Sequence, residues 1–104
     1  MANYVLAYRG GGMPETEAEQ QAVMAAWGAW YGELAAAVVD GGNPFGPSAS
    51  VAPGGAVSEP APSALSGYTI VTADDLGAAT ALAQGCPVLA SGGAVDVYET
   101  IAVM

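Results

Sequence analysis

The chain has 104 residues, 53% of them hydrophobic and 11% charged, and it carries one basic side chain against ten carboxylates, for a formal net charge of −9. This length predicts one domain, residues 1–104, with a single core. The acidic balance disfavours binding to nucleic acid and to anionic membranes, because both are bound mainly through Lys and Arg. We find neither an apolar run of the ~20 residues that cross a bilayer nor a secretory leader, so we expect a cytoplasmic protein without membrane contact.

The first part of the chain predicts a strand followed by a helix. Residues 3–9 are rich in strand formers, and the glycines at 10–12 end that pattern. Thr16 with Glu19 three residues later is a capping-box pattern, so a helix is expected to begin near residue 16. Apolar residues then recur at spacings of three and four and form one helical stripe: Val23, Trp27, Trp30, Leu34 and Val38.

The second half of the chain predicts a loop, a strand, a helix and a last strand. Residues 43–66 are crowded with Pro, Gly, Ser and Ala, which indicates a long irregular connection with at most a short hairpin near residues 50–57. Residues 67–72 predict a strand. Residues 94–103 are apolar at nearly every position, which is typical of a strand with both faces covered.

A helix is expected between these two strands, over residues 74–84. Thr72 followed by Asp75 indicates a second capping box at its start. Gly85 and Pro87 are suited to its end.

Several runs, taken in chain order, match the pattern of a known family: "YRGG", "WGAWYGEL", "GNPFGPS", "SGYTIVTADDLGAATALAQGCPVL" and "YETIAVM". Through these runs the chain resembles YCII-related proteins of the dimeric ferredoxin-like α/β-barrel group over nearly its whole length. The resemblance implies an α+β fold, a ferredoxin-like βαββαβ domain with an antiparallel sheet and both helices on one face. The other face would meet the sheet of a second subunit and close a dimeric α/β barrel.

The low charge content is consistent with this homodimer, because a monomer surface normally carries more charged residues. Better-studied members of the wider family are thought to use a His and Asp pair in a pocket, and this chain contains no histidine. The resemblance therefore implies the fold and the dimer, and it assigns no catalytic residue.

The residue types that are absent exclude several reaction classes. Without His or Lys, the chain cannot form a Ser-His-Asp, Cys-His or Ser-Lys arrangement, or a Schiff base. One Cys and no His disfavour zinc, haem and iron–sulfur sites. We therefore expect no cofactor and no metal, and we interpret Cys86 as a buried structural residue.

The remaining polar groups suggest a candidate pocket between helix and sheet. Arg9, Tyr68 and Glu99 would supply its polar contacts, and Trp27 and Trp30 are candidates for its aromatic walls. Because Arg9 is the only cation of an acidic chain, we expect its guanidinium to be partly buried against a carboxylate. Glu99 is the first candidate partner, and Asp96 is the second.

Two functional hypotheses follow from the sequence. In the first, a homodimer binds or transforms a small metabolite, aromatic or carboxylate-bearing, in this pocket. In the second, the dimer is a non-catalytic structural or regulatory module, and Arg9 only neutralises a neighbouring carboxylate. We favour the first hypothesis.

Overall fold

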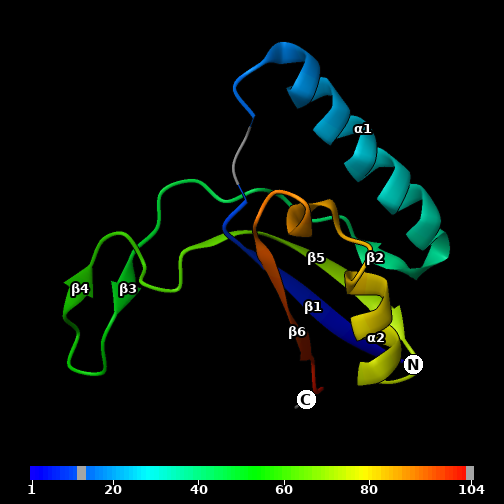
Figure 1. Ribbon diagram of the computed structural model, residues 1–104. Helices are drawn as coiled ribbons and strands as arrows, with labels where there is room; N and C mark the ends of the chain where they lie inside the picture. Colours follow the sequence, from blue (N-terminus) through cyan, green and yellow to red (C-terminus); the bar gives the residue numbers. More distant parts are fainter. Residues whose placement is uncertain (12–13, 103–104) are drawn as a thin grey trace.

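A four-stranded antiparallel sheet with strand order β2-β5-β1-β6 carries two helices on one face, which gives an α+β fold (Figure 1). The computed structural model describes residues 1–11 and 14–102. The sheet and its helices are formed by β1 (Ala2–Arg9), α1 (Glu17–Leu34), β2 (Val38–Asp40), β5 (Leu65–Ala73), α2 (Leu76–Ala83) and β6 (Ala94–Glu99). Two short 3₁₀ helices, η1 (Ala35–Ala37) and η2 (Pro87–Leu89), and a separate hairpin of β3 (Ser50–Val51) and β4 (Val57–Ser58) complete the described chain.

The core lies between the sheet and the helices, and β1 runs through its centre. Alternate residues of β1, namely Tyr4, Leu6 and Tyr8, are buried on the helix side. Trp30 of α1 and Ala79 of α2 belong to the same buried cluster. Both helices therefore cover the same face of the sheet.

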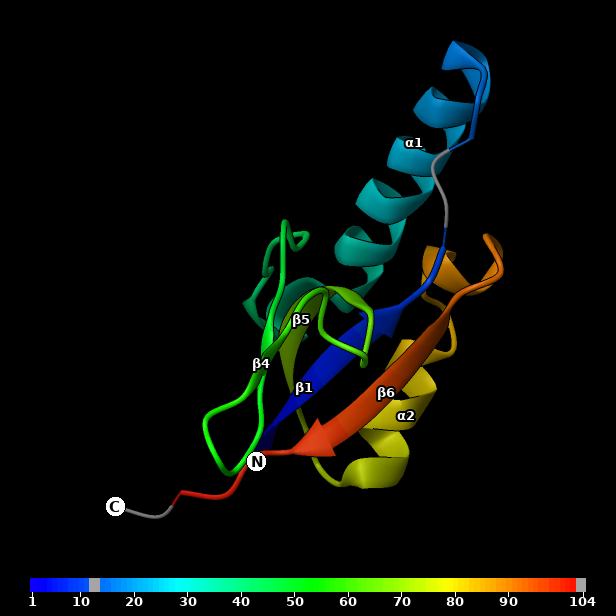
Figure 2. The ribbon, with the colours of Figure 1, turned by 90° about the vertical axis from the view of Figure 1, so that its left-hand side faces the viewer.

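The helix α1 begins as expected, because the Thr16 hydroxyl accepts a hydrogen bond from the Glu19 backbone N–H at 3.2 Å. Only Trp30 and Leu34 of this helix are fully buried, whereas Val23 and Trp27 are half-buried. The N-terminal half of α1 extends beyond the end of the sheet (Figures 1 and 2). Within the described chain, no helix combines the length and the apolar character needed to cross a membrane.

The helical stripe ends earlier than the sequence predicts, so the placement of Val38 in the helix is wrong. Ala35 adopts φ 48° and ψ −119°, a conformation that breaks the helix after Leu34. The chain then makes one short 3₁₀ turn, and Val38 begins β2, where it pairs with Val71 of β5.

The long connection contains one short hairpin, which is the most that its sequence was expected to hold. Ser50 pairs with Ser58, and Val51 pairs with Val57. The hairpin projects away from the sheet on the side opposite the helices (Figures 1 and 2).

The second helix is capped differently from the prediction. Asp75, not Thr72, is the N-cap of α2, and its Oδ1 accepts from the Ala78 N–H at 2.7 Å. Thr72 instead donates to the carbonyl of Ala2 at 3.2 Å and ties β5 to β1. The prediction failed because Thr72 still lies inside β5, which runs to Ala73.

The last strand is shorter and more exposed than expected. β6 ends at Glu99, and its residues are half-buried or exposed, since helices cover only one face of the sheet. The end of the predicted strand, Val103, lies outside the described residues. Figure 2 views the sheet from the face without helices, which we call the open face.

Candidate functional site

A cavity of about 390 Å³ lies at the end of the sheet where β1 finishes and β5 begins, between α1 and the glycine turns that follow β1 and β2. Its walls come from segments far apart in the sequence. The lining residues are Tyr8, Gly10, Gly11, Val23, Trp27, Tyr31, Gly41, Gly42, Asn43, Pro44, Ser66, Gly67, Tyr68, Val88 and Ser91.

Aromatic rings form much of the wall. The Trp27 ring meets Tyr8 edge-to-face, with centroids 5.2 Å apart and planes at 81°. Trp27 also lies 6.1 Å from Tyr31, one helical turn further along α1. Phe45 stacks on Tyr68 at 5.7 Å outside this group, because Phe45 does not line the cavity and Tyr68 pairs with Ala7 on the open side of the sheet. These separations are typical of attractive aromatic pairs, so the packed rings support one another as a wall.

Three hydroxyl groups meet beside the cavity, and we call Tyr8, Thr69 and Tyr31 the hydroxyl cluster. The Tyr8 hydroxyl donates to Thr69 Oγ1 at 2.6 Å. Thr69 donates to the carbonyl of Gly41 at 3.1 Å, and the Tyr31 hydroxyl reaches the same carbonyl at 3.0 Å. The Tyr31 and Thr69 oxygens lie 3.0 Å apart. The cluster therefore ties β1, β5, α1 and the turn after β2 together at one end of the cavity.

Burial raises the pKa of two groups here, Tyr8 of the hydroxyl cluster and Cys86. Desolvation raises the pKa of Tyr8 far above the usual range for a phenol, because the hydroxyl is removed from water. Desolvation likewise raises the pKa of the Cys86 thiol to about 11. Both groups are therefore neutral at physiological pH, and Cys86 is buried as expected.

The turn after β2 forms the cavity wall only because residue 42 is glycine. Gly42 has φ 72°, and its N–H donates to the Asp40 carboxylate at 2.8 Å. A Cβ at this position would collide with the carbonyl oxygen of Tyr68. Glycine thus lets the turn lie directly against β5.

Two of the five residues expected at the site line this cavity, namely Trp27 and Tyr68. Trp30 lies in the core, where its indole N–H donates to the Leu82 carbonyl at 3.1 Å. Arg9 and Glu99 are not among the lining residues. The structure therefore places Trp27 and Tyr68 at the cavity, Trp30 in the core, and the two charged residues outside the lining.

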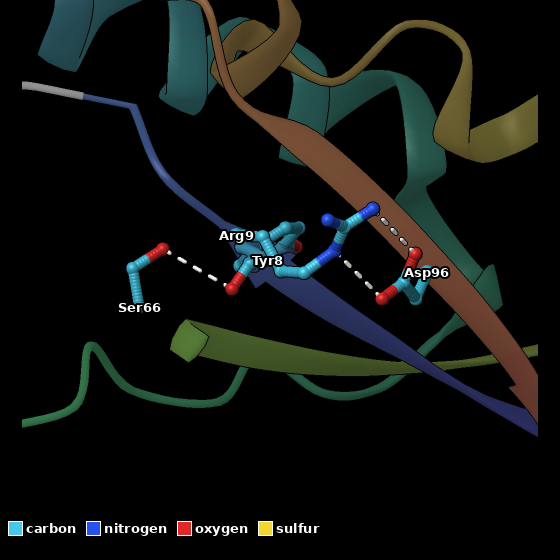
Figure 3. A network of polar contacts seen from close by, with 4 residues as sticks. All are labelled: Tyr8, Arg9, Ser66 and Asp96. Atoms are coloured by element: carbon cyan, nitrogen blue, oxygen red, sulfur yellow. Dashed lines mark hydrogen bonds and ion pairs between the residues drawn. The ribbon is translucent and has the colours of Figure 1, made fainter. Parts of the chain in front are cut away.

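The prediction that Glu99 pairs with Arg9 is wrong, and the second candidate, Asp96, is the partner. The Arg9 guanidinium forms a two-pronged pair with Asp96, with Nε–Oδ2 at 2.8 Å and Nη2–Oδ1 at 3.1 Å (Figure 3). Glu99 cannot take this role, because it pairs in register with Tyr4 at the opposite end of β1, and it accepts from the Tyr4 hydroxyl at 2.9 Å. The side chains of Arg9 and Asp96 are 49% and 35% exposed, so the pair is only partly shielded from water.

The sequence reasoning missed Tyr8, Tyr31 and Thr69. A signal was present for Tyr31, which follows Trp27 by four residues and so shares its helical face. Thr69 stands in an apolar strand, where a hydroxyl needs a partner. The glycine turns that close the cavity depend on tertiary approach, which no local pattern encodes.

Charged and metal-binding groups are scarce around the cavity. None of its described lining residues is an Asp, Glu, Lys, Arg or Cys. Over residues 1–11 and 14–102, no three metal-ligating side chains of the His, Cys, Asp or Glu type converge. Within the described chain, the lining therefore offers a ligand aromatic surface, hydroxyls, one amide side chain and the backbone.

Comparisons of this chain with known protein families, curated proteins and solved structures found no match.

Proposed function

We propose that the protein is a small homodimer that binds a small-molecule ligand in the cavity between α1 and the end of the sheet. The observation that carries the proposal is the cavity itself. Its volume of about 390 Å³ and its aromatic lining suit a ligand site, since such sites commonly have 300–1,000 Å³ and mostly apolar walls.

Binding rather than turnover is the activity that the lining supports best. General acid–base catalysis needs a group that exchanges protons near the working pH. The described lining has no carboxylate or thiol, and the pKa of Tyr8 is raised by burial. The groups that remain can orient a ligand by hydrogen bonds and ring contacts.

A relationship to the YCII-related group and its ferredoxin-like topology forms part of this proposal. With the β3–β4 hairpin set aside, the elements follow the order β1, α1, β2, β5, α2, β6. This is the βαββαβ succession of ferredoxin-like domains. The antiparallel order β2-β5-β1-β6, with both helices on one face, supports the same interpretation.

The exposed area of the chain supports a homodimer. The chain exposes 6661 Å², whereas a compact monomer of 10.2 kDa would expose roughly 5,300 Å². Its radius of gyration of 15.1 Å likewise exceeds the ~13 Å of a compact domain of this length. The excess area is larger than the ~800 Å² that each partner buries in a standard interface.

The open face supplies a surface suited to a second copy. Tyr98, Val5 and Ile70 lie side by side across β6, β1 and β5 and form an apolar row. Beside this row, Arg9 and Asp96 neutralise each other, and Asp40, which pairs in register with Ile70, adds one carboxylate at the edge. Because the whole chain carries a charge of −9, two copies repel unless they meet through a surface with little net charge. The open face comes near this condition, since Asp40 at its edge is, among the described residues, its one carboxylate beside the row without a cation.

A non-catalytic dimerisation module is the second candidate, and one observation favours it. Arg9 is engaged with Asp96 and is not among the cavity-lining residues, as this hypothesis expects. On this hypothesis the protein acts through contacts at its open face, and the cavity between α1 and the turns has no ligand.

Ligand-observed NMR with monocyclic aromatic compounds of positive, negative and zero charge separates the two candidates. We expect at least one compound to bind the native chain and to lose binding in Val23→Phe, because Val23 lines the cavity and a phenyl group would occupy it. Met24→Phe is the matched control, since Met24 is the next residue of α1 and is 69% exposed. Absence of binding by every compound, or binding that survives Val23→Phe, would favour the dimerisation module.

A further inference from the structure

We propose that the ligand of this cavity is an uncharged aromatic ring that carries a hydrogen-bond donor, an O–H or an N–H. The inference rests on the proposed function, because it names the chemical class that the same cavity would take. It narrows the ligand from small metabolites in general to neutral phenol-like or benzyl-alcohol-like molecules.

The walls favour a ring. Tyr8, Trp27 and Tyr31 come from β1 and α1, and all three line the cavity. Tyr8 and Trp27 stand nearly perpendicular to each other, at 81°. A planar ring that lies against both side chains can meet one of them face-on and the other edge-on, which are the favoured geometries of aromatic pairs.

The lining favours a ligand that carries neither a negative nor a positive charge. A buried ion is costly unless a counter-ion pairs with it, and no described lining residue is charged. Arg9, the only basic side chain, is held by Asp96. The carboxylate-bearing ligand considered from the sequence therefore has no cation to meet it in the described lining.

The hydroxyl cluster favours a ligand that donates. Tyr8 gives its proton to Thr69, and Thr69 gives its proton to the Gly41 carbonyl. Tyr31 donates to the Gly41 carbonyl, or to Thr69, within 3.0 Å. At this cluster, an accepting ligand must take the Tyr31 proton from an existing bond, whereas a donating ligand adds a bond to the Tyr31 oxygen.

The Ser66 hydroxyl, which lines the cavity but lies outside the hydroxyl cluster, also donates within the protein. Ser66 Oγ lies 3.3 Å from the carbonyl oxygen of Tyr8 and 3.2 Å from that of Gly10, and it can only donate to either (Figure 3 draws the contact with Tyr8). Its proton is therefore used within the protein. At these hydroxyls, the capacity that remains for a ligand is the capacity to accept.

Four compounds of similar size test the inference by calorimetry or NMR titration: benzyl alcohol, benzyl methyl ether, benzylamine and benzoate. We expect benzyl alcohol to bind about three- to tenfold more tightly than the ether, which is the ratio that one neutral hydrogen bond supplies. The ammonium and carboxylate compounds should bind more weakly than both. In Tyr31→Phe, which keeps the ring and removes the hydroxyl, the advantage of the alcohol over the ether should disappear.

The outcomes separate this inference from the proposed function. Tighter binding of benzylamine or benzoate, abolished by Val23→Phe and kept by Met24→Phe, would overturn the inference and leave the cavity as a ligand site. Equal binding of alcohol and ether to the native chain would overturn the donor requirement. Failure of all four compounds to bind would overturn the inference together with the proposed function.

Discussion

Arg9 shows how one side chain is constrained by the register of its strand. Its partner Asp96 is a neighbour across β1 and β6, whereas Glu99 lies near the other end of β1. The pair is short but half exposed, at 49% and 35%. Solvent screening therefore limits what the pair contributes to stability.

Replacing Arg9 with Ala should lower the free energy of unfolding by no more than about 1 kcal/mol, as is usual for exposed pairs. Urea denaturation at constant protein concentration measures this. A double-mutant cycle with Asp96→Asn should give a coupling energy below about 1 kcal/mol. A coupling energy of about 3 kcal/mol or more would mean that the pair is buried in solution.

Two adjacent glycines provide a matched test of the turn that forms the cavity wall. Gly42→Ala should lower the free energy of unfolding by more than about 2 kcal/mol, because φ is positive and the new Cβ would meet the Tyr68 carbonyl. Gly41→Ala should stay within about 1 kcal/mol of the native chain, since a Cβ there meets open space. Thermal denaturation of the two variants measures the contrast, and equal melting temperatures would contradict this structure of the turn.

Because the Cys86 thiol is buried, we expect the protein to lose stability at alkaline pH. Burial raises the pKa of Cys86 from 9.0 to about 11, so in the folded state the thiol stays neutral where the unfolded chain would ionise. Its contribution is fully present below pH 9 and is lost as the pH rises from 9 to 11, by about 1 kcal/mol at pH 10. Tyr8, whose pKa is also raised by burial, adds to this loss at higher pH.

Urea denaturation at pH 7, 8, 9 and 10 measures this slope. Cys86→Ala should reduce the change in stability between pH 8 and pH 10, whatever its effect at pH 7. An identical slope in both chains would show that the thiol ionises equally well when folded.

At the scale of elements, the end of α1 is the part that the sequence predicts least well. The apolar spacing continues to Val38, but the helix stops at Leu34 because Ala35 takes a conformation with φ 48° and ψ −119°. Glycine adopts this region readily, as it does at the first central position of a type II′ turn. Alanine there stores strain.

Ala35→Gly should therefore raise the free energy of unfolding by about 1 kcal/mol, because the strain at the helix end is relieved. Ala36→Gly is the control: Ala36 lies in the 3₁₀ turn η1 and does not share this φ, so glycine there should give no gain. Chemical denaturation compares the two variants. A loss of stability in Ala35→Gly would mean that alanine is not strained at this position.

Other elements followed closely from local patterns. The cap at Thr16, the strands β1 and β5 and the short hairpin were predicted from spacing and turn residues, because these features depend on neighbours in sequence. Strand register depends on how distant segments pair, so the partner of Arg9 could not be predicted from the residues of β1 alone. The contact between Tyr8 and Thr69 likewise joins two strands, so it was not expected from either segment.

At the scale of the whole molecule, the structure leaves surface that a single chain does not cover. The open face presents Tyr98, which is 61% exposed, in an apolar row with Val5 and Ile70. The hairpin and the N-terminal half of α1 project from the sheet and add to the exposed area (Figures 1 and 2). We propose a second copy of the chain as the partner of the open face.

Substitution on the open face should separate the subunits without unfolding them. Tyr98→Asp places a charge in the apolar row, and burying it in an interface would be costly. Met24→Asp is the control, because Met24 is exposed to a similar degree, 69%, but lies on α1 on the other side of the sheet. We expect the first variant to favour the monomer and the second to keep the native assembly state.

The mass of the native chain in solution tests the homodimer most directly. Each chain has a mass of 10.2 kDa. Sedimentation equilibrium or light scattering at micromolar concentration should give twice this value for the native protein and for Met24→Asp, and a lower value for Tyr98→Asp. A native protein that sediments as a single chain at this concentration would contradict the account.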